Sequence, residues 1–238
     1  MSLQVEFDRF AGDYRRIHDN NLTAIGYSSS YFAERKVREI HARVKSCHLA
    51  LRILDLGCGD GLCTDFFKTS FPNSAIYGLD VSAKTIFTAQ KKGVSDTIFG
   101  IFDGRQIPFL TGTFNIIMLA NVLHHIDTVE KQVSVLKECR RVLKTEGILF
   151  IFEHNPLNPI TRRLVRHCLF DADARLILHT QMKRLLRRLH FDVKCRFIMF
   201  FPGFLAGLDF LEKFLWWAPI GGQYYAVCTK AHPQDYSV

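Results

Sequence analysis

Short apolar runs of strand length alternate with segments of helical periodicity from residue 51 onward. The apolar runs are LRILDLG (51–57), AIYGLD (75–80), TIFGIFD (97–103), FNIIMLAN (114–121) and GILFIFE (147–153). Residues 129–143 show the clearest helical spacing between the runs. This alternation predicts a parallel sheet with helices on both faces. The almost entirely apolar strands are typical of a sheet that is covered on both sides.

The two ends of the chain depart from this alternation. Residues 1–50 have helical periodicity and predict a helical appendage, followed by one sheet domain over residues 51–238. Two insertions are expected in that domain, at about 154–178, with a short helix, and at about 202–221. An amphipathic helix and two final strands complete the pattern, over residues 179–190, 191–201 and 222–230. The predicted class is a doubly wound α/β domain with a helical N-terminal appendage.

Composition and charge narrow the class of protein. The 238 residues are 48% hydrophobic, enough for a sizeable core. Seven scattered cysteines favour a reducing compartment, and Cys58 and Cys63 lack the second pair that a zinc site needs, so no metal is expected. We expect a soluble, cytoplasmic protein, because the N-terminus does not resemble a signal peptide and the apolar run 197–208 is too short to span a bilayer. The net charge of +8 fits either an anionic partner or a basic enzyme.

A glycine loop follows the first apolar run, in the sequence ILDLGCGDGLC (53–63). Glycines at the end of a strand let the backbone approach a ligand closely. The spacing departs from the dinucleotide fingerprint, because Leu62 stands where the third glycine should be. A phosphate needs hydrogen-bond donors and positive potential, whereas Asp55 ends the strand and Asp60 lies in the loop. The loop therefore favours a cationic ligand, although Asp60 is better explained as a helix N-cap.

Short polar side chains also end the next three strands. Asp80, Asp103 and Asn121 close the runs YGLD, IFD and LAN. A single Asp at the end of a strand is usually a turn or cap residue. Three such ends in order behind a glycine loop instead predict one ligand-binding edge, for a ligand with a positive centre, a ribose and a base.

In these motifs the chain resembles the class I S-adenosylmethionine-dependent methyltransferases, over roughly residues 51–153. The resemblance implies a Rossmann-like sheet of seven strands, mostly parallel, with an antiparallel last strand. It implies S-adenosyl-L-methionine as cofactor and S-adenosyl-L-homocysteine as product. It also implies a set of cofactor-binding residues: Asp55, Gly57, Cys58 and Gly59 beside the methionine moiety, Asp80 on the ribose, Val81, Asp103 and Gly104 at the adenine, and Asn121 beside the sulfonium. Tyr14 and Tyr27 of the appendage could close over the donor or simply pack on the surface.

Candidate catalytic residues follow the fourth and fifth strands. Methyl transfer to an oxygen usually needs a base for the acceptor proton, whereas transfer to a neutral amine does not. NVLHHID supplies His124 and His125, and FEHNP supplies Glu153 and His154. Adjacent residues tend to diverge, so only one of His124 and His125 is expected to face the pocket. Each of the four residues has a structural role as its alternative.

The acceptor is expected to be small and apolar or lipid-like, and a nucleic acid is not expected. The place where amino-methylating enzymes of adenine carry Asn-Pro-Pro-aromatic reads ANVLHH here. Residues 203–217 predict one helix with Phe204, Leu208 and Leu211 on a common face and Asp209 and Glu212 on another. This segment is a candidate lid over the acceptor, a candidate peripheral membrane anchor, or plain packing.

The sequence thus predicts a methyltransferase that acts on an oxygen or nitrogen of such an acceptor. A donor-binding module without catalysis, serving as a partner or regulatory subunit, is the main alternative. An RNA methyltransferase is a further one. The sequence leaves the oligomeric state open.

Overall fold

The computed structural model describes residues 14–23, 25–44, 48–93, 96–168, 171 and 174–231. Its strands are β1 (Arg52–Leu56), β2 (Ala75–Asp80), β3 (Thr97–Ile101), β4 (Phe114–Ala120), β5 (Leu143–His154), β6 (Phe191–Ile198) and β7 (Gln223–Lys230). They form one seven-stranded sheet in the order β3-β2-β1-β4-β5-β7-β6. Neighbours among β1 to β5 pair in parallel, and β7 pairs antiparallel with both β5 and β6. The predicted mostly parallel sheet with an antiparallel last strand is therefore confirmed.

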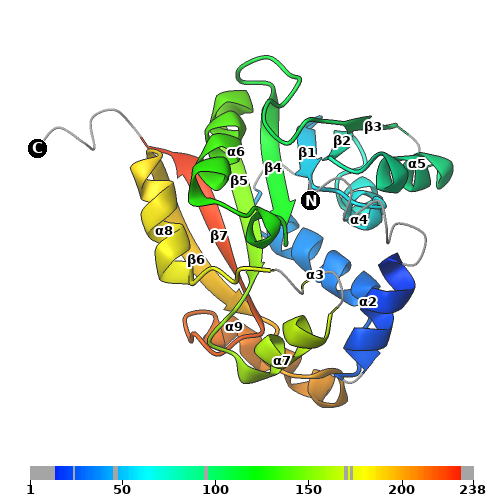
Figure 1. Cartoon of the computed structure of the whole chain (residues 1–238), viewed down its shortest axis with the longest axis vertical. Coiled ribbons are helices and arrows are strands. Elements are labelled where there is room, and N and C mark those ends of the chain that lie inside the picture. The colour runs from blue at the N-terminus through cyan, green and yellow to red at the C-terminus, as the bar shows by residue number, and fades with distance from the viewer. Residues whose placement is uncertain are drawn as a thin grey trace, which may run out of the picture.

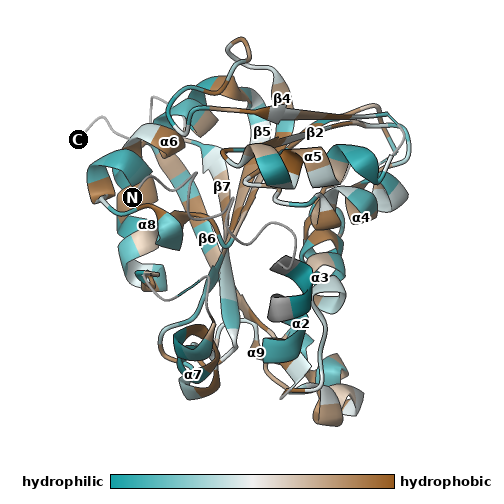
Figure 2. Cartoon of the chain, turned by 45° about the vertical axis from the view of Figure 1, so that its right-hand side comes forward, coloured by the Kyte–Doolittle hydropathy of each residue, from teal (hydrophilic) through white to brown (hydrophobic). Residues whose placement is uncertain are grey.

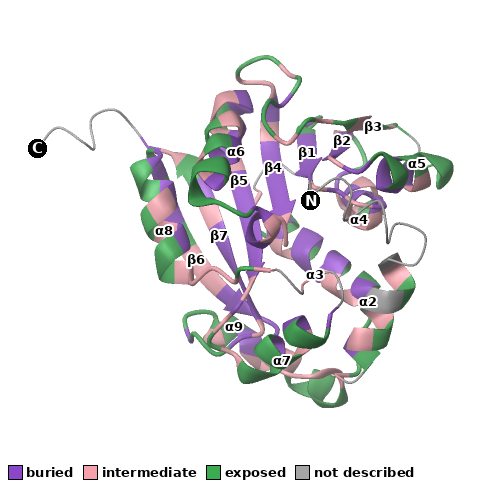
Figure 3. Ribbon diagram, in the orientation of Figure 1, coloured by how far each residue is buried: buried purple, intermediate pink, exposed green. Residues whose placement is uncertain are grey.

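Helices cover both faces of this sheet (Figure 1). The helices are α2 (Tyr14–Thr23), α3 (Ser29–His41), α4 (Leu62–Ser70), α5 (Ala83–Lys91), α6 (Val129–Val142), α7 (Pro159–His167), α8 (His179–Arg188) and α9 (Glu212–Leu215), with 3-10 turns η1 (Leu123–His125) and η2 (Gly203–Leu211). One core cluster joins the sheet to α6 and α8, and a second joins it to α3 and α4. The central strands are buried almost throughout (Figure 3). This burial explains why their sequences are apolar on both faces.

Several helices begin at the residue that the sequence chemistry favours. Ser28, Ser82 and Thr128 each accept a hydrogen bond from a backbone N–H in the first turn of α3, α5 and α6. Asn158 does the same for α7, which has Pro159 in its first turn. Such caps satisfy backbone donors that the helix leaves free, and they set where the loops at the carboxyl edge of the sheet end.

The chain gathers a second layer beyond the carboxyl ends of the parallel strands. Helices α2, α7 and α9 lie below the sheet in the views of Figures 1 and 2. Helix α2 contacts α7. The loop after α2 touches the start of η2, where the Gly203 N–H donates to the Ile25 carbonyl at 2.7 Å. Segments far apart in the sequence therefore meet over one edge of the sheet. Among the described helices, none is both long and apolar enough to cross a bilayer.

The expectation of a single helix over residues 203–217 was wrong. The segment forms the 3-10 turns of η2, interrupted by non-helical backbone at Leu205, and then the single-turn helix α9. Its two acidic side chains point inward: Arg35 donates to Glu212 at 2.6 Å, and Tyr31 donates to Asp209 at 3.2 Å. These tertiary contacts override the helical spacing, because a buried carboxylate is stable only beside its partners.

Candidate functional site

The glycine loop crosses the carboxyl end of the sheet with its backbone in the left-handed region. Gly57, Gly59 and Gly61 have φ values of 79°, 54° and 80°. The N–H groups of Gly57 and Cys58 donate to the carbonyl of Leu79, at 2.7 and 3.1 Å, and so fasten the loop to β2. A Cβ at Gly57 would lie 2.4 Å from Val122, whereas one at Gly59 would meet nothing within 4 Å. The loop is packed at Gly57 and open at Gly59.

Asp80 holds this loop from the end of β2. Its Oδ2 accepts from the Gly59 N–H at 2.8 Å, and its Oδ1 accepts from the Ser82 N–H at 2.9 Å. Burial raises the pKa of Asp80, and these backbone donors oppose the rise. The Val81 backbone and the Thr85 side chain also lower this pKa through hydrogen bonds, so Asp80 ties the glycine loop to the start of α5.

A cavity opens beside the loop, between the sheet edge and the second layer. Six predicted site residues line it: Asp55, Gly57, Cys58, Gly59, Asn121 and His154. The opposite wall is largely apolar and comes from α2, α3, α7 and residues 199–202, including Leu22, Ile25, Phe32, Leu164, Val165, Met199 and Phe201. The cavity therefore has one polar wall at the sheet and one apolar wall beneath it.

Three buried acceptor atoms on the polar wall have no hydrogen-bond partner among the described residues. They are Asp55 Oδ2, Asn121 Oδ1 and Gln223 Oε1, and all three residues line the cavity. Asn121 holds a left-handed backbone, φ 59°, at the end of β4, a conformation that Asn tolerates better than most residues. Leaving such atoms unpaired is unfavourable. The cavity is thus chemically matched to a ligand that brings N–H donors or positive charge.

The charges at this wall are coupled. Burial and the nearby Asp80 raise the pKa of Asp55 to about 7, and Lys36 opposes this rise. Burial lowers the pKa of Lys36, against the attraction of Cys63, Glu153 and Asp55. Lys36 extends from α3 and lines the same cavity. A carboxyl group and an ammonium group thus face one cavity, which suits a ligand end that carries both charges.

Four other predicted cofactor-binding residues lie outside the lining of this cavity, namely Asp80, Val81, Asp103 and Gly104. Asp103 is exposed and accepts from the N–H groups of Arg105 and Gln106, both at 2.8 Å, and these bonds lower its pKa. A Cβ at Gly104 would lie 3.5 Å from Val81. The ends of β2 and β3 therefore form an open ledge beside the loop. Tyr14 begins α2, but its side chain lies outside the described residues.

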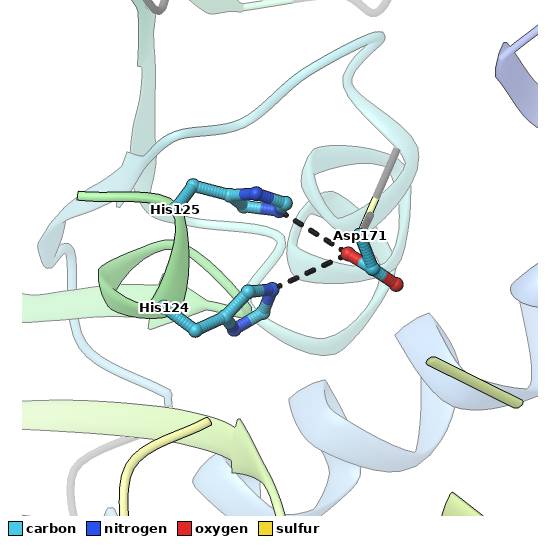
Figure 4. A group of neighbouring side chains, drawn as sticks. All are labelled: His124, His125 and Asp171. Carbon is cyan, nitrogen blue, oxygen red and sulfur yellow. Dashed lines mark ion pairs between the residues drawn. The ribbon is translucent and has the colours of Figure 1, made fainter. Parts of the chain in front are cut away.

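His124 and His125 do not diverge as expected. They follow β4 on the turn η1, and both rings point toward Asp171 from the segment after α7 (Figure 4). Burial lowers the pKa of His124, but the carboxylates of Glu153 and Asp171 outweigh it and raise that pKa to about 9. Burial and the neighbouring His124 lower the pKa of His125 to about 3. Two consecutive residues can converge here because a 3-10 turn places side chains closer in angle than a strand does.

Glu153 lies behind His124. One of its oxygens is 2.5 Å from His124 Nδ1, and the other accepts from the Leu123 N–H at 2.9 Å. Glu153 is fully buried and is absent from the cavity lining, as are His124 and His125. Of the four predicted catalytic residues, His154 alone reaches the cavity wall. Its ring centroid lies 5.2 Å from that of His124.

The comparison with known families agrees with this geometry. A family model described as a methyltransferase domain matches residues 54–151. Over these residues the chain carries a methyltransferase domain, which supports its resemblance to the class I S-adenosylmethionine-dependent methyltransferases. The matched residues run from β1 to β5 and contain the glycine loop, Asp80 and the turn η1.

Curated relatives of this chain include enzymes named for quinone synthesis. A demethylmenaquinone methyltransferase of Thermotoga maritima is 32% identical over 152 residues, which cover 64% of this chain and 61% of that protein. A ubiquinone biosynthesis O-methyltransferase of Parvibaculum lavamentivorans is 26% identical over 175 residues, 71% of this chain and 62% of that protein. The chain spans about three fifths of the length of these curated relatives. A solved S-adenosylmethionine-dependent methyltransferase of T. maritima shares the fold, with a TM-score of 0.67 at 16% identity over 96% of this chain and 100% of that one.

One expectation about the methyltransferase loop was wrong. Asp60 does not cap α4; the N-cap position is Gly61, with no side-chain hydrogen bond. Asp60 instead forms ion pairs with Arg15 at 2.7 Å and Lys92 at 2.9 Å. Both partners come from other parts of the chain, so local spacing could not reveal them.

Sequence reasoning missed other residues at the cavity. Lys36 could have been predicted from the sequence, because it lies four residues after Phe32 and four before Ile40, within the apolar stripe of α3. A lysine in such a stripe must reach a partner or a cavity. Asp171 and Gln223 had no local signal, because their place depends on how α7 and β7 return to the sheet edge.

Proposed function

We propose that this chain transfers a methyl group from S-adenosyl-L-methionine to an oxygen or nitrogen of a small, apolar or amphiphilic acceptor. The observation that carries this proposal is the cavity with two unlike walls. Unpaired acceptors of Asp55, Asn121 and Gln223 line the sheet side, and apolar side chains line the facing side. A cationic donor and an apolar acceptor are the two ligands that such walls suit.

The donor would contact the polar wall and the ledge beside it. Bound there, S-adenosyl-L-methionine would supply a methyl group activated by a sulfonium. Asp55 and Asn121 would accept from its ammonium, and Lys36 would pair with its carboxylate. Gly59 gives the open approach, and Asp80 would accept from the ribose hydroxyls. The ledge of Val81, Asp103 and Gly104 would take the adenine, with Cys58 and Gly57 beneath the chain of the ligand.

The protein's contribution to the reaction is alignment and exclusion of water. Methyl transfer is an in-line displacement, so the acceptor atom must lie opposite the leaving sulfur. The apolar side chains of α2, α3 and α7 would hold an apolar acceptor in that place and keep water out. His154 at the cavity wall is our candidate to take the proton of an acceptor hydroxyl. Glu153 and His124 would act behind it as positioning residues.

The names of the relatives support a ring-shaped, lipid-like acceptor. One relative is named for demethylmenaquinone and another for ubiquinone biosynthesis, and quinones of this kind combine a polar ring with an apolar chain. The cavity's apolar wall ends at residues 199–202, and the exposed apolar side chains of η2 and α9 follow directly. We therefore infer that residues 203–217 contact a lipid surface rather than cover the cavity as a lid.

The distribution of side chains in residues 203–217 supports this contact. Asp209 and Glu212 face the protein, whereas Phe204, Phe210 and Trp217 are between 62% and 77% exposed. A surface segment in water normally has the reverse arrangement. Arg162, Arg163 and Arg166 on α7, a helix of the same second layer, are also exposed, and they suit an anionic surface.

Donor binding and methyl transfer are tested separately. S-adenosyl-L-homocysteine should bind in calorimetry with one site per chain and raise the melting temperature, whereas NAD should do neither. Labelled methyl from the donor should then appear in a hydroxylated quinone precursor with an apolar tail. Donor binding without label in lipid, RNA, protein or small-molecule fractions of a cell extract would favour the binding-module alternative. Label in the RNA fraction alone would favour the RNA methyltransferase alternative.

A further inference from the structure

A compact group of three ligand-type side chains lies beside the acceptor cavity. His124 and His125 come from the turn η1, and Asp171 comes from the segment after α7 (Figure 4). Each offers one atom, and the three atoms lie within 4.8 Å of one another. Two imidazoles and one carboxylate on the same side of a site form a ligand set that divalent transition metals prefer.

Two of the three distances in the group suit a shared cation better than direct hydrogen bonds. The Nε2 atoms of His124 and His125 each lie 3.5 Å from the same atom, Asp171 Oδ1. Direct N–H to oxygen bonds are usually about 2.7–3.2 Å long. Ligand atoms at about 2.1 Å from a tetrahedral zinc ion lie about 3.4 Å from one another. In addition, His124 Nε2 is buried and makes no hydrogen bond with any described residue.

The surroundings of His124 are those of a metal ligand. Its Nδ1 faces Glu153 at 2.5 Å, which turns its Nε2 toward Asp171. A carboxylate behind a ligating histidine fixes the tautomer and orientation of the ring. The turn is also fixed, because Gln132 donates to the carbonyls of Leu123 at 3.0 Å and Ile126 at 3.2 Å. The ring of His124 and the turn that carries both histidines are therefore held in place before any ion arrives.

We propose that His124, His125 and Asp171 bind one divalent transition metal ion of the zinc type. This site departs from the expectation that the chain binds no metal. Three protein ligands leave at least one coordination position open. Asp171 and His154 line the cavity, whereas His124 and His125 lie behind its wall, so Asp171 is the ligand that would connect the ion to the acceptor side. If the proposed function holds, the ion would lower the pKa of an acceptor hydroxyl as a Lewis acid, and His154 would take the released proton.

Metal binding is measured directly, apart from methyl transfer. Protein dialysed against a chelator is titrated with Co²⁺, as a visible probe for zinc sites, and with Zn²⁺ in calorimetry. We expect one ion per chain and d–d absorption of nitrogen and oxygen ligands. His125→Ala and Asp171→Asn should each weaken binding by more than about 100-fold, beyond the loss usual for an outer partner of a ligand. His167→Ala, on the exposed face of α7, is the matched control and should bind normally.

Other results would overturn the site. These are the absence of Co²⁺ and Zn²⁺ binding in the millimolar range, equal binding by the variants and the control, or a sulfur-to-cobalt charge-transfer band that assigns the ion to cysteines. Melting temperature and S-adenosyl-L-homocysteine affinity of each variant show that it is folded. Because these readouts need no acceptor, failure of the metal site and failure of the methyl transfer remain distinguishable.

Discussion

The two walls of the cavity are built in different ways. The donor wall uses strand ends and backbone: Gly57 and Cys58 bond to Leu79, and Gly59 bonds to Asp80. The acceptor wall depends on side chains that join distant parts of the chain, such as Arg35 to Glu212 and Tyr27 to the carbonyl of Phe201. A wall made by the sheet tolerates changes in the second layer, whereas a wall made by side chains changes when one contact is lost. Such a division of the cavity lets one fold keep its donor site while the acceptor wall differs from protein to protein.

The largest effect is expected from a substitution that disrupts the acceptor wall. Arg35→Met leaves Glu212, whose side chain is 4% exposed, without its cation. Removing one partner of a buried ion pair usually costs about 3–5 kcal/mol. We therefore expect urea denaturation to show that the unfolding free energy falls by an amount near the lower end of this range. The affinity for S-adenosyl-L-homocysteine should change much less than the KM of the acceptor. Lys131→Met, in the exposed pair with Asp127, is the control and should cost less than about 0.5 kcal/mol. An equal loss of donor affinity would show that the two walls are not separable.

The second prediction alters the donor wall alone. Gly59→Ala forces a side chain onto left-handed backbone, which costs about 1–2 kcal/mol, and places a methyl group where the donor should approach. Gly112→Ala is a matched control, because Gly112 has φ 68° and would also meet nothing within 4 Å. Both variants should lose similar stability in urea denaturation. Calorimetry should show reduced S-adenosyl-L-homocysteine affinity for Gly59→Ala only; equal affinities would remove the donor from this loop.

The difference between the two walls also determines which of their residues could be predicted from the sequence. The place of Asp55, Asp80 and Asn121 at one edge follows from strand ends, which any parallel sheet aligns. Lys36 was also open to detection, as a charged residue within an apolar stripe. The inward orientation of Asp209 and Glu212 could not be predicted from the sequence, because it depends on Tyr31 and Arg35 far earlier in the chain. The place of Asp171 beside two histidines likewise requires the path of the chain after α7.

The third prediction uses the charge of the donor wall. The pKa of Asp55, about 7 in the free protein, lies above its ordinary value, so its carboxyl group is largely protonated in mildly acidic solution. A cationic donor binds the ionised form. Affinity should therefore fall as the pH drops below about 7, by up to tenfold (about 1.4 kcal/mol) per pH unit.

Calorimetry with S-adenosyl-L-homocysteine, from about pH 5.5 to about pH 8.5, measures this dependence. Binding near pH 7 should release protons, seen as a dependence of the heat on the buffer. Asp55→Asn should bind more weakly at high pH and lose the acid dependence. Lys36→Met is a second variant: without the cation that opposes the rise, the pKa of Asp55 should move upward, and the fall in affinity should begin at higher pH. An unchanged profile in Asp55→Asn would assign the titration to another group.

The smallest expected effect on stability concerns the exposed side of the acceptor wall. Phe214 and Trp217 are 62% and 64% exposed, so changing both to Ser should alter the unfolding free energy by less than about 0.5 kcal/mol for each residue. Each aromatic ring that enters a lipid surface contributes about 1.5–3 kcal/mol, so sedimentation with vesicles containing phosphatidylglycerol should fall by at least tenfold. Leu110→Ser is the control: Leu110 is 84% exposed but precedes β4, at the opposite edge of the sheet. If this control loses as much binding as the double variant, the lipid contact is not specific to residues 203–217, and the acceptor must reach the cavity from solution.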